Sequence, residues 1–406
     1  MRLRRIIWKL LLIVTVSLIL LFIFLNTNDK SENYSDDFIT ILRNTKEDAT
    51  ANEEDQQQLQ QQQPLTSSQV GVKQVTSRPL LNLTQFEYLI DNDLCERFKK
   101  ELTAILIVTS YIGHDELRAA HRQAISQTKL AEMGMQRVFL LASLPTKEHF
   151  ITQSQIFNEQ ERFGDLLQGN FNEAYRNLSY KHVMGLEWAA KRCDRAKFII
   201  KIDDDIIYDV FHLKRYLDSL ELENLELTKS NEMLCGYVLD EKPVIRNQAN
   251  KWYVRPDEYN FNNYPSYLSG WLYITNPKTA LRLVNQAYSS PIFWIDDTWI
   301  TGILREPLNI PLQRLNNWFS ANPDFLNCCV RDLKKPNAME CEFFVGPNGG
   351  DSKLLIEFLH NVEKCYYDEC LKRSKEQSLK NTCVGSVKHI LPDHGNAEVK
   401  MVSMGR

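Results

Sequence analysis

A hydrophobic run that ends in three consecutive carboxylates constrains the fold of this chain most strongly. Residues 198–202 are apolar apart from Lys201 and read as a buried strand, and Asp203, Asp204 and Asp205 follow directly. A loop must begin here, because three adjacent anions cannot be buried without partners. Ligands bind at the carboxyl ends of strands in parallel α/β sheets, so a divalent cation with oxygen ligands could meet a charged substrate at this point. The alternative is a solvated acidic turn.

Strand and helix patterns that alternate upstream of this acidic triplet predict a doubly wound α/β sheet. Ala104–Ser110 is an unbroken apolar run typical of a parallel strand, Glu116–Leu130 has a helical pattern, and Arg137–Ala142 reads as a second strand. Two strand–helix units in a row indicate parallel strands with helices packed on the sheet. Further elements are expected as helices over Phe171–Cys193 and Val210–Glu223 and a strand over Leu234–Val238.

Basic residues on the first two predicted helices are candidates for binding a nucleotide. Arg118 and Arg122 follow the first strand and are placed to meet phosphates or a base. Lys181 lies off the apolar stripe of the next helix and can reach an anionic ligand. Solvated helix faces are the alternative for all three side chains.

Aromatic residues gather between the triplet and the C-terminal third of the chain. Tyr264–Tyr273 is dense in Tyr, Trp, Pro and Gly, and Lys251–Val254 precedes it. This composition suits a loop at a sugar site, because the CH faces of sugars pack on aromatic rings while their hydroxyls bind polar edges. A surface loop held by aromatic packing is the alternative. The expected substrate contacts are Trp252, Tyr267, Gly270 and Trp271.

A second acidic site follows another hydrophobic run. Residues 291–295 lead into Asp296 and Asp297, and the chain continues apolar to Leu304. Carboxylates between core segments are costly unless they are used or hydrogen-bonded. The alternative is a helix N-cap, which is compatible with function because a capping carboxylate can still present one oxygen.

The N-terminus predicts a membrane anchor. Basic residues at positions 2, 4 and 5 precede an apolar segment over residues 6–25, close to the ~20 residues that span a bilayer. A cleaved signal peptide is the alternative, but the run is longer than a usual signal core and no small-residue cleavage site follows. The basic cluster predicts a cytoplasmic tail over residues 1–5 and a lumenal remainder, which is a single-pass type II topology.

Composition divides the lumenal part into three segments. Residues 26–94 are polar and Gln-rich and predict a disordered stem, residues 95–385 predict the catalytic domain, and residues 386–406 form a polar tail. The net charge of −4 does not suggest a nucleic-acid partner. Glycosylation sequons begin at Asn33, Asn82 and Asn177. Nine cysteines, six of them in the C-terminal third, are expected mostly as disulfides in a lumen, with a pairing that the sequence leaves open.

Five blocks of the sequence, taken together, resemble the β1,3-galactosyltransferase-like family of Golgi type II, inverting, UDP-sugar-dependent enzymes. The blocks are FNEAYRNLSYK at residues 171–181, Trp188 with Cys193, KIDDD at residues 201–205, YPSYLSG at residues 264–270 and DDTW at residues 296–299. They are similar to the family patterns F-x-D-x-Y-x-N-L-T-x-K, W…C, K-x-D-D-D, Y-P-x-Y-x-x-G and E-D-V-Y. The resemblance spans roughly residues 104–297, with a weaker part to about residue 346.

The resemblance implies a GT-A type fold and a UDP-sugar donor bound with Mn²⁺ or another divalent cation. Asp203 and Asp205 match the family's metal-binding pair, with Asp203 and Asp204 beside the nucleotide-sugar. Asp297 matches the catalytic general base for the acceptor hydroxyl, and Asp296 would contact substrate. The chemistry is coherent, because a metal spreads the charge that develops on UDP, and inversion needs a carboxylate within reach of the acceptor hydroxyl.

The chain departs from the family pattern at several positions. The helix that usually reads R-R-x-A-I-R-x-T-W has His121, Ser126 and Lys129 in place of two arginines and the tryptophan, which leaves Arg118 and Arg122 as possible substitutes. Asp296 is one methylene shorter than the usual Glu. Many members have a late histidine that could be a third metal ligand, whereas residues 344–347 here contain none and His360 is the nearest candidate.

The leading interpretation is an inverting glycosyltransferase at the Golgi membrane. It would move a hexose, either galactose or an N-acetylhexosamine, from a UDP-sugar to a hydroxyl of a glycoprotein or glycolipid glycan, making a β1,3 linkage. A non-catalytic glycan-binding or chaperone-like relative on the same fold is the alternative, although it would have no chemical reason to keep both acidic sites. A glycoside hydrolase is a third option, and the aspartate triplet and the absence of a catalytic glutamate argue against it.

Overall fold

An eight-stranded mixed sheet organises the folded body. The computed structural model describes residues 79–146, 150–223, 232–367 and 370–384. The strand order is β1-β4-β3-β2-β5-β8-β7-β9, and a small antiparallel pair, β6 with β10, lies outside this sheet. The strands are β1 (Tyr88–Ile90), β2 (Ala104–Thr109), β3 (Met135–Ser143), β4 (Leu166–Asn172), β5 (Phe198–Asp203), β6 (Ile206–Tyr208), β7 (Leu234–Leu239), β8 (Tyr267–Thr275), β9 (Gln313–Arg314) and β10 (Val345–Pro347).

The order of strands reverses at β2, as a doubly wound sheet requires. β2 pairs in parallel with β3 on one side and with β5 on the other, and Thr109 at the end of β2 lies opposite Asp203 at the end of β5. β8 then pairs antiparallel with β5 and makes the sheet mixed. This confirms the predicted doubly wound mixed sheet. The crevice at the carboxyl ends of β2 and β5 is therefore the place where such a fold binds ligands.

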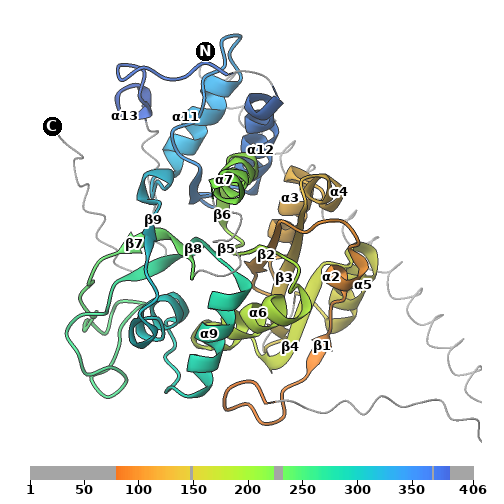
Figure 1. Cartoon of the computed structure of the whole chain (residues 1–406), viewed down its shortest axis with the longest axis vertical. Coiled ribbons are helices and arrows are strands. Elements are labelled where there is room, and N and C mark those ends of the chain that lie inside the picture. Colours follow the sequence, from red (N-terminus) through yellow and green to blue (C-terminus); the bar gives the residue numbers. More distant parts are fainter. Residues whose placement is uncertain (1–78, 147–149, 224–231, 368–369, 385–406) are drawn as a thin grey trace, which may run out of the picture. The chain divides into compact units, whose positions relative to one another are not determined.

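Two hydrophobic cores cover the two faces of the sheet. Alternate residues of β2 enter different cores: Leu106 and Val108 pack in one, and Ile105 and Ile107 in the other. Figure 1 shows α7 and α12 on one side of the sheet and α6 and α9 on the other. The helices are α2 (Leu94–Arg97), α3 (Asp115–Ala124), α4 (Gln127–Glu132), α5 (Gln153–Phe163), α6 (Leu178–Arg192), α7 (Val210–Glu223), α9 (Pro277–Tyr288), α10 (Asp296–Thr298), α11 (Pro323–Leu333), α12 (Ser352–Tyr367) and α13 (Leu379–Thr382).

Three predicted elements differ from the structure. The helix expected over residues 116–130 is two helices, because Ile125 is extended and Ser126 caps α4 by accepting a hydrogen bond from the Lys129 N–H at 3.1 Å. The helix expected from Phe171 begins only at Leu178, after strand β4 and a short 3-10 turn. The expected aromatic loop contains strand β8, whose first residues alternate between the core and the cleft.

The folded body begins before residue 95. Leu80, Phe86, Ile90 and Leu94 are buried, and β1 pairs with β4, so residues 79–94 pack with the domain rather than belonging to a stem. The predicted tail at residues 1–5, the anchor at residues 6–25, Asn33 and the C-terminal segment 386–406 lie outside the described residues. Within the described part of the chain, no helix has the length and apolarity to cross a membrane.

The two sequons inside the described residues differ in access. Asn82 is exposed, and its side-chain oxygen accepts a hydrogen bond from the Tyr180 hydroxyl at 2.8 Å. The Asn177 side-chain nitrogen donates to the Asn172 carbonyl at 2.8 Å, and the hydroxyl of its sequon partner Ser179 is buried against the Phe293 carbonyl. Glycosylation of Asn82 therefore stays a prediction, whereas the geometry disfavours it at Asn177.

Eight of the nine cysteines form disulfides, as expected for a lumenal chain. The pairs are Cys95–Cys193, Cys328–Cys383, Cys329–Cys341 and Cys365–Cys370, and Cys235 is free and buried. Four disulfides indicate folding in an oxidising compartment.

The Cys95–Cys193 bond is expected to matter most for stability. It closes a loop of sequence separation 98, whereas Cys365–Cys370 closes one of 5. The chain-entropy relation gives a loss of about 4.7 kcal/mol for the long loop and about 2 kcal/mol for the short one. Denaturant titration of the two double Cys→Ser variants tests this, and equal losses of unfolding free energy would contradict it.

Candidate active site

A cleft of about 1690 Å³ lies at the switch point of the sheet. Both acidic sites line it, although they are far apart in the sequence, and its volume exceeds the several hundred Å³ of a typical small-molecule site. The residues expected at the site that line this cleft are Lys181, Asp203, Asp204, Asp205, Trp252, Tyr267, Gly270, Trp271, Asp296 and Asp297. Arg118 and Arg122 were also expected at the site, but they do not line this cleft.

The three aspartates after β5 point to different partners. Asp203 is about a third exposed to the cleft, and Asp205 is exposed. Asp204 is buried, and its carboxylate accepts a hydrogen bond from His114 Nδ1 at 2.9 Å while its carbonyl accepts one from His121 Nε2. Burial acts to raise the pKa of Asp204, but the hydrogen bond and charge of His114, together with smaller contributions from Ser110 and His121, outweigh it and hold this pKa low. The carboxylates of Asp203 and Asp205 are therefore available to a ligand, whereas the carboxylate of Asp204 binds His114 inside the protein.

Lys201 joins the two acidic sites and was not among the expected site residues. Its side chain is only 1% exposed, and its ammonium donates to Asp203 Oδ1 and to the Gly270 carbonyl, each at 2.5 Å. Burial acts to lower the pKa of Lys201, but the charges of Asp203, Asp296 and Asp297 raise it, so the lysine remains cationic. The signal in the sequence was a lysine inside an otherwise apolar strand, because a buried cation needs anionic partners.

Asp297 is held at the cleft by backbone donors. Its Oδ2 accepts from the Gly270 N–H at 3.0 Å and its Oδ1 from the Thr298 N–H at 2.7 Å. A Cβ at position 270 would lie 3.3 Å from both Asp297 Cβ and Lys201 Nζ, so a glycine there permits the close approach. The helix begins at Asp296 with Ile295 in the N-cap position, so neither aspartate is its N-cap residue.

The charges around Asp297 suit a base. Burial raises the pKa of this carboxyl, the adjacent Asp296 raises it further, and Lys201 opposes the shift. Burial also acts on Asp296, but the hydrogen bond from His182 and the charge of Lys201 lower its pKa. Two neighbouring carboxyls with pKa values moved in opposite directions are typical of divided acid–base roles.

The two arginines expected to bind a nucleotide form ion pairs inside the protein instead. Arg118 is fully buried, where it forms a bidentate pair with Glu159 at 2.8 Å and donates to the carbonyls of Tyr111 and Ile112. Arg122 binds Glu159 and Asp165, each at 2.7 Å. Glu159 on α5 and Asp165 before β4 thus take up both guanidinium groups, and the expectation of nucleotide contacts fails for this geometric reason.

Lys181 reaches the edge of the cleft but has no donor to spare. Its ammonium contacts both Glu173 oxygens at 2.6 and 2.7 Å and the Ser110 carbonyl at 2.6 Å, and the side chain is buried. An ammonium has three N–H groups, and these three contacts account for them. Lys181 therefore positions the end of β2 and, as placed, leaves no N–H for a phosphate.

Other residues at the end of β2 also line the cleft, and they are not among the residues that the sequence predicts for the site. Thr109 ends this strand, and Ser110, Tyr111 and His114 follow it. The Tyr111 and His114 rings lie edge to face with centroids 5.2 Å apart. The Thr109 hydroxyl is buried without a hydrogen-bond partner among the described residues. These groups offer an aromatic face and polar edges on the Asp203 side of the cleft.

An aromatic wall lines the cleft near the second acidic site. It consists of Tyr175, Trp252 and Trp294, and the Trp252 indole donates to the Tyr175 hydroxyl at 2.9 Å. Tyr175 and Trp252 are 49% and 43% exposed, so their rings are open to a ligand. The Lys251 ammonium lies 4.5 Å from the centroid of the Trp252 ring. Of these residues only Trp252 was expected, because Tyr175 and Trp294 belong to distant segments.

The carboxylates that face the cleft have the chemistry to hold a divalent cation. No group of three or more His, Cys, Asp or Glu side chains that could hold a metal occurs among residues 79–384 where the structure describes them. Asp203 and Asp205 are hard oxygen donors, and ions of this kind are often held by one or two carboxylates with substrate phosphates and water. His360 lies outside the cleft and contacts the Gln123 carbonyl at 3.2 Å, so it is not placed as a third ligand.

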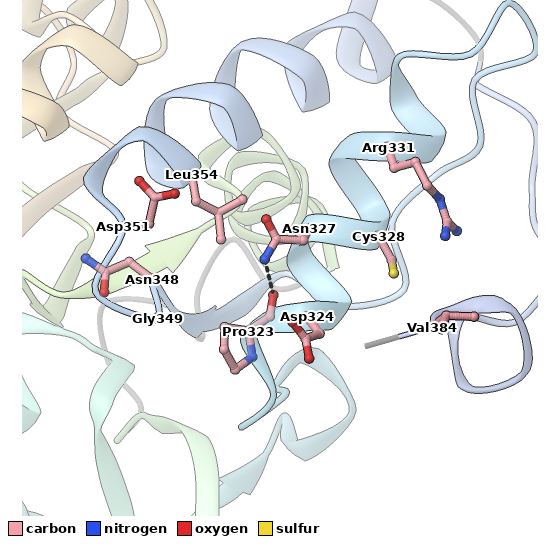
Figure 2. Close-up of a pocket in the computed structure, with 10 residues that line it drawn as sticks. All are labelled: Pro323, Asp324, Asn327, Cys328, Arg331, Asn348, Gly349, Asp351, Leu354 and Val384. Atoms are coloured by element: carbon pink, nitrogen blue, oxygen red, sulfur yellow. Dashed lines mark hydrogen bonds between the residues drawn. The ribbon is translucent and has the colours of Figure 1, made fainter. Parts of the chain in front are cut away.

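A smaller cavity of about 330 Å³ lies between α11 and the start of α12 (Figure 2). Its polar groups mostly serve local structure: Asp351 accepts from the Lys353 N–H, Asn348 from the Gly350 N–H, and Asn327 donates to the Pro323 carbonyl. Figure 2 shows the Arg331 side chain directed away from Asp351. The chemistry therefore belongs to the large cleft.

Comparison with known proteins places the chain near enzymes that build glycans. The galactosyltransferase family matches residues 117–316. Beta-1,3-galactosyltransferase 5 of Homo sapiens is 28% identical over 66% of this chain and 80% of its own length, and that of Mus musculus is 30% identical over 59% and 74%. N-acetyllactosaminide beta-1,3-N-acetylglucosaminyltransferase 2 of Mus musculus is 28% identical over 57% and 56%. Among solved structures, the WbbM bifunctional glycosyltransferase aligns with a TM-score of 0.33 and 13% identity, covering 67% of this chain and 52% of its own.

Proposed function

This chain belongs to the galactosyltransferase family, and from that premise we propose that it is an inverting, UDP-sugar-dependent hexosyltransferase that makes β1,3 linkages. The donor sugar would be galactose or an N-acetylhexosamine, since relatives of both names are similar to it. The acceptor would be a hydroxyl of a glycoprotein or glycolipid glycan. The mixed sheet with its ligand cleft at the switch point agrees with a GT-A type fold.

The observation that carries the proposal is the link through Lys201. This one buried ammonium binds Asp203 at the end of β5 and the Gly270 carbonyl on β8, and the N–H of Gly270 holds Asp297. The two acidic sites are thereby fixed relative to each other within one cleft. Displacement at an anomeric carbon with inversion needs both a site for the leaving group and a base for the incoming hydroxyl, and the two acidic sites can supply these roles.

Each side of the cleft has a separate task in this proposal. Asp297 accepts the proton of the acceptor hydroxyl, and the backbone N–H groups of Gly270 and Thr298 keep its carboxylate in place. Thr109, Ser110 and Tyr111 bind the nucleoside end of the donor at the end of β2. Asp203 and Asp205 would hold a divalent cation such as Mn²⁺, which would supply positive charge to stabilise the leaving diphosphate.

We assign the acceptor glycan to the aromatic wall. Tyr175 and Trp252 expose ring faces close to the second acidic site, and sugar CH faces pack on such rings. Tyr267 and Trp271 of β8 also line the cleft and continue this surface toward Asp297.

Replacement of Trp252 by alanine is expected to weaken acceptor binding selectively. Aromatic stacking contributes about 0.5–1.5 kcal/mol beyond the area it buries, so the acceptor KM should rise about tenfold while the UDP-sugar KM stays the same. Initial-rate kinetics with each substrate varied measure both constants. Phe261→Ala is the matched control, because Phe261 is 64% exposed but does not line the cleft. A rise in the donor KM instead would contradict the assignment.

A Golgi location with a type II anchor is part of the proposal. Its support is the basic and apolar N-terminal sequence together with the four disulfides, which suit the lumen of the secretory pathway.

Product analysis with purified full-length chain tests the function. The protein is incubated with a panel of UDP-sugars and Mn²⁺, with and without glycan acceptors ending in galactose or an N-acetylhexosamine, and UDP release is followed. Acceptor-dependent UDP release with a new β1,3 linkage in the product is the expected result. Binding of UDP-sugars without release under any condition would overturn it in favour of a non-catalytic protein.

A further inference from the structure

A buried hydrogen-bond chain stands behind the second acidic site. His182 on α6 is fully buried between Asp296 and Tyr273, with Nδ1 2.8 Å from Asp296 Oδ2 and Nε2 2.5 Å from the Tyr273 hydroxyl. Tyr273 lies on β8 and is also fully buried. The three groups come from three elements, α6, α10 and β8, and α10 packs against both of the others.

The hydrogen bonds from Tyr273 through His182 to Asp296 all point in one direction. Burial lowers the pKa of His182 against the opposing influence of Asp296, and burial raises that of Tyr273, so both side chains are neutral. A neutral imidazole has one donor and one acceptor. The Tyr273 hydroxyl then donates to Nε2, and Nδ1–H donates to the Asp296 carboxylate. This order leaves Asp296 with a fixed orientation and a negative charge.

Asp296 in turn stands next to Asp297 and near Lys201. One oxygen of Asp296 is taken by His182, whereas Asp297 accepts from two backbone N–H groups and, at 3.4 Å, from the Thr298 hydroxyl. A rotation of Asp296 would shift the carboxylate that neighbours Asp297 and the charge opposite Lys201. Misplacement of a reacting group by about 1 Å can cost on the order of a hundredfold in rate.

We propose that His182, supported by Tyr273, is a positioning residue that fixes Asp296 and through it the geometry of Asp297 and Lys201. This inference rests on the proposed function, in which Asp297 is the base. His182 would not touch substrate, since it is fully buried and does not line the cleft.

The test compares variants that remove one or both of the hydrogen bonds made by His182. His182→Leu removes both hydrogen bonds and is expected to lower kcat by about 10- to 100-fold while the KM of the UDP-sugar changes less than about twofold. His182→Asn keeps a donor near the position of Nδ1 and is expected to recover most of the loss. Tyr273→Phe removes only the hydroxyl and is expected to have an intermediate kcat. His212→Asn replaces a half-buried histidine of α7 that lies outside the cleft, and its kcat should match the wild type.

The outcomes separate this inference from the proposed function. Wild-type kcat in His182→Leu overturns the inference. A kcat in His182→Asn that is as low as in His182→Leu overturns it too. If His182→Leu fails to fold, Tyr273→Phe decides, because a lower kcat with unchanged donor KM supports the positioning role and an unchanged kcat overturns it. Asp297→Asn is measured beside them: turnover in that variant would refute the proposed base, whereas its inactivity together with wild-type kcat in His182→Leu would refute only the positioning role.

Discussion

Asp297→Asn is expected to remove turnover while leaving UDP-sugar binding intact. The amide keeps nearly the same shape and can remain at Gly270, but it cannot accept a proton from the acceptor hydroxyl. A general base contributes roughly 10²- to 10⁴-fold, so kcat should fall within that range or further. Asp297 is bound to Gly270 on β8, which β5 separates from β2 in the sheet, and donor affinity should therefore change little.

Product formation and UDP-sugar binding by calorimetry, measured on the same preparation, check this expectation. Asp194→Asn is the matched control, since Asp194 is exposed in the turn after α6 and does not line the cleft. Wild-type turnover by Asp297→Asn would mean that another group removes the proton. An equal loss of donor binding would mean that the substitution disturbed the cleft as a whole.

The pH dependence of the wild type should report the same carboxyl. Burial and the adjacent Asp296 raise the pKa of Asp297 above its ordinary value of about 3.9. A base works when it is deprotonated, so transfer is complete above this raised pKa and is lost as the pH falls through it. The charged groups that act on this carboxyl are Asp296 and Lys201. The tyrosines near it are neutral because burial raises their pKa values: Tyr175, Tyr264, Tyr267 and Tyr273. The profile of kcat/KM against pH, which reports the free enzyme, should therefore have an acid limb above the range of an exposed aspartate.

Asp205→Ala is expected to abolish transfer that depends on a divalent cation. Asp205 is the most exposed carboxylate of the triplet, and its removal leaves Asp203 alone, with one oxygen already held by Lys201. Loss of one of two protein ligands should weaken cation binding enough that added Mn²⁺ no longer restores the rate. The fold should be unaffected, because the contact between Asp205 and Asn348 uses the backbone carbonyl.

Titration of activity with Mn²⁺ tests this prediction, with Asp194→Ala as the surface control. Binding of Mn²⁺ followed by isothermal calorimetry gives a readout that does not depend on turnover. A wild-type Mn²⁺ titration curve in Asp205→Ala would exclude Asp205 as a ligand.

Local pattern was enough to place the strands that build the site. β2, β3 and β5 were predicted within a few residues because continuous apolar runs have few alternatives in a parallel sheet. β8 was mistaken for a loop, since its Pro, Gly and aromatic residues suggest a turn. Its alternation of cleft-facing and buried side chains becomes evident only when β5 and β7 are seen to pair with it.

Charged side chains were harder to assign than strands. Arg118, Arg122 and Lys181 all looked available to a ligand, yet each is paired with an acid. Arg118 and Arg122 bind Glu159 and Asp165 from a distant segment, whereas Lys181 binds Glu173, which lies eight residues before it. A sequence shows that a charge exists but not which partner lies beside it, because ion pairs form between residues that only the fold brings together. His182 and Lys201 were overlooked for the same reason.

The sequence alone shows a buried strand that leads into Asp203, Asp204 and Asp205, and a second acidic pair after another apolar run. What the triplet does follows from the fold, which turns Asp204 inward to His114 and leaves Asp203 and Asp205 toward the cleft. It also decided that Lys201 connects the triplet to Asp297 through Gly270. The physical reason is that apolar periodicity is a local property of the chain, whereas the environment of a charge depends on partners that are distant in sequence.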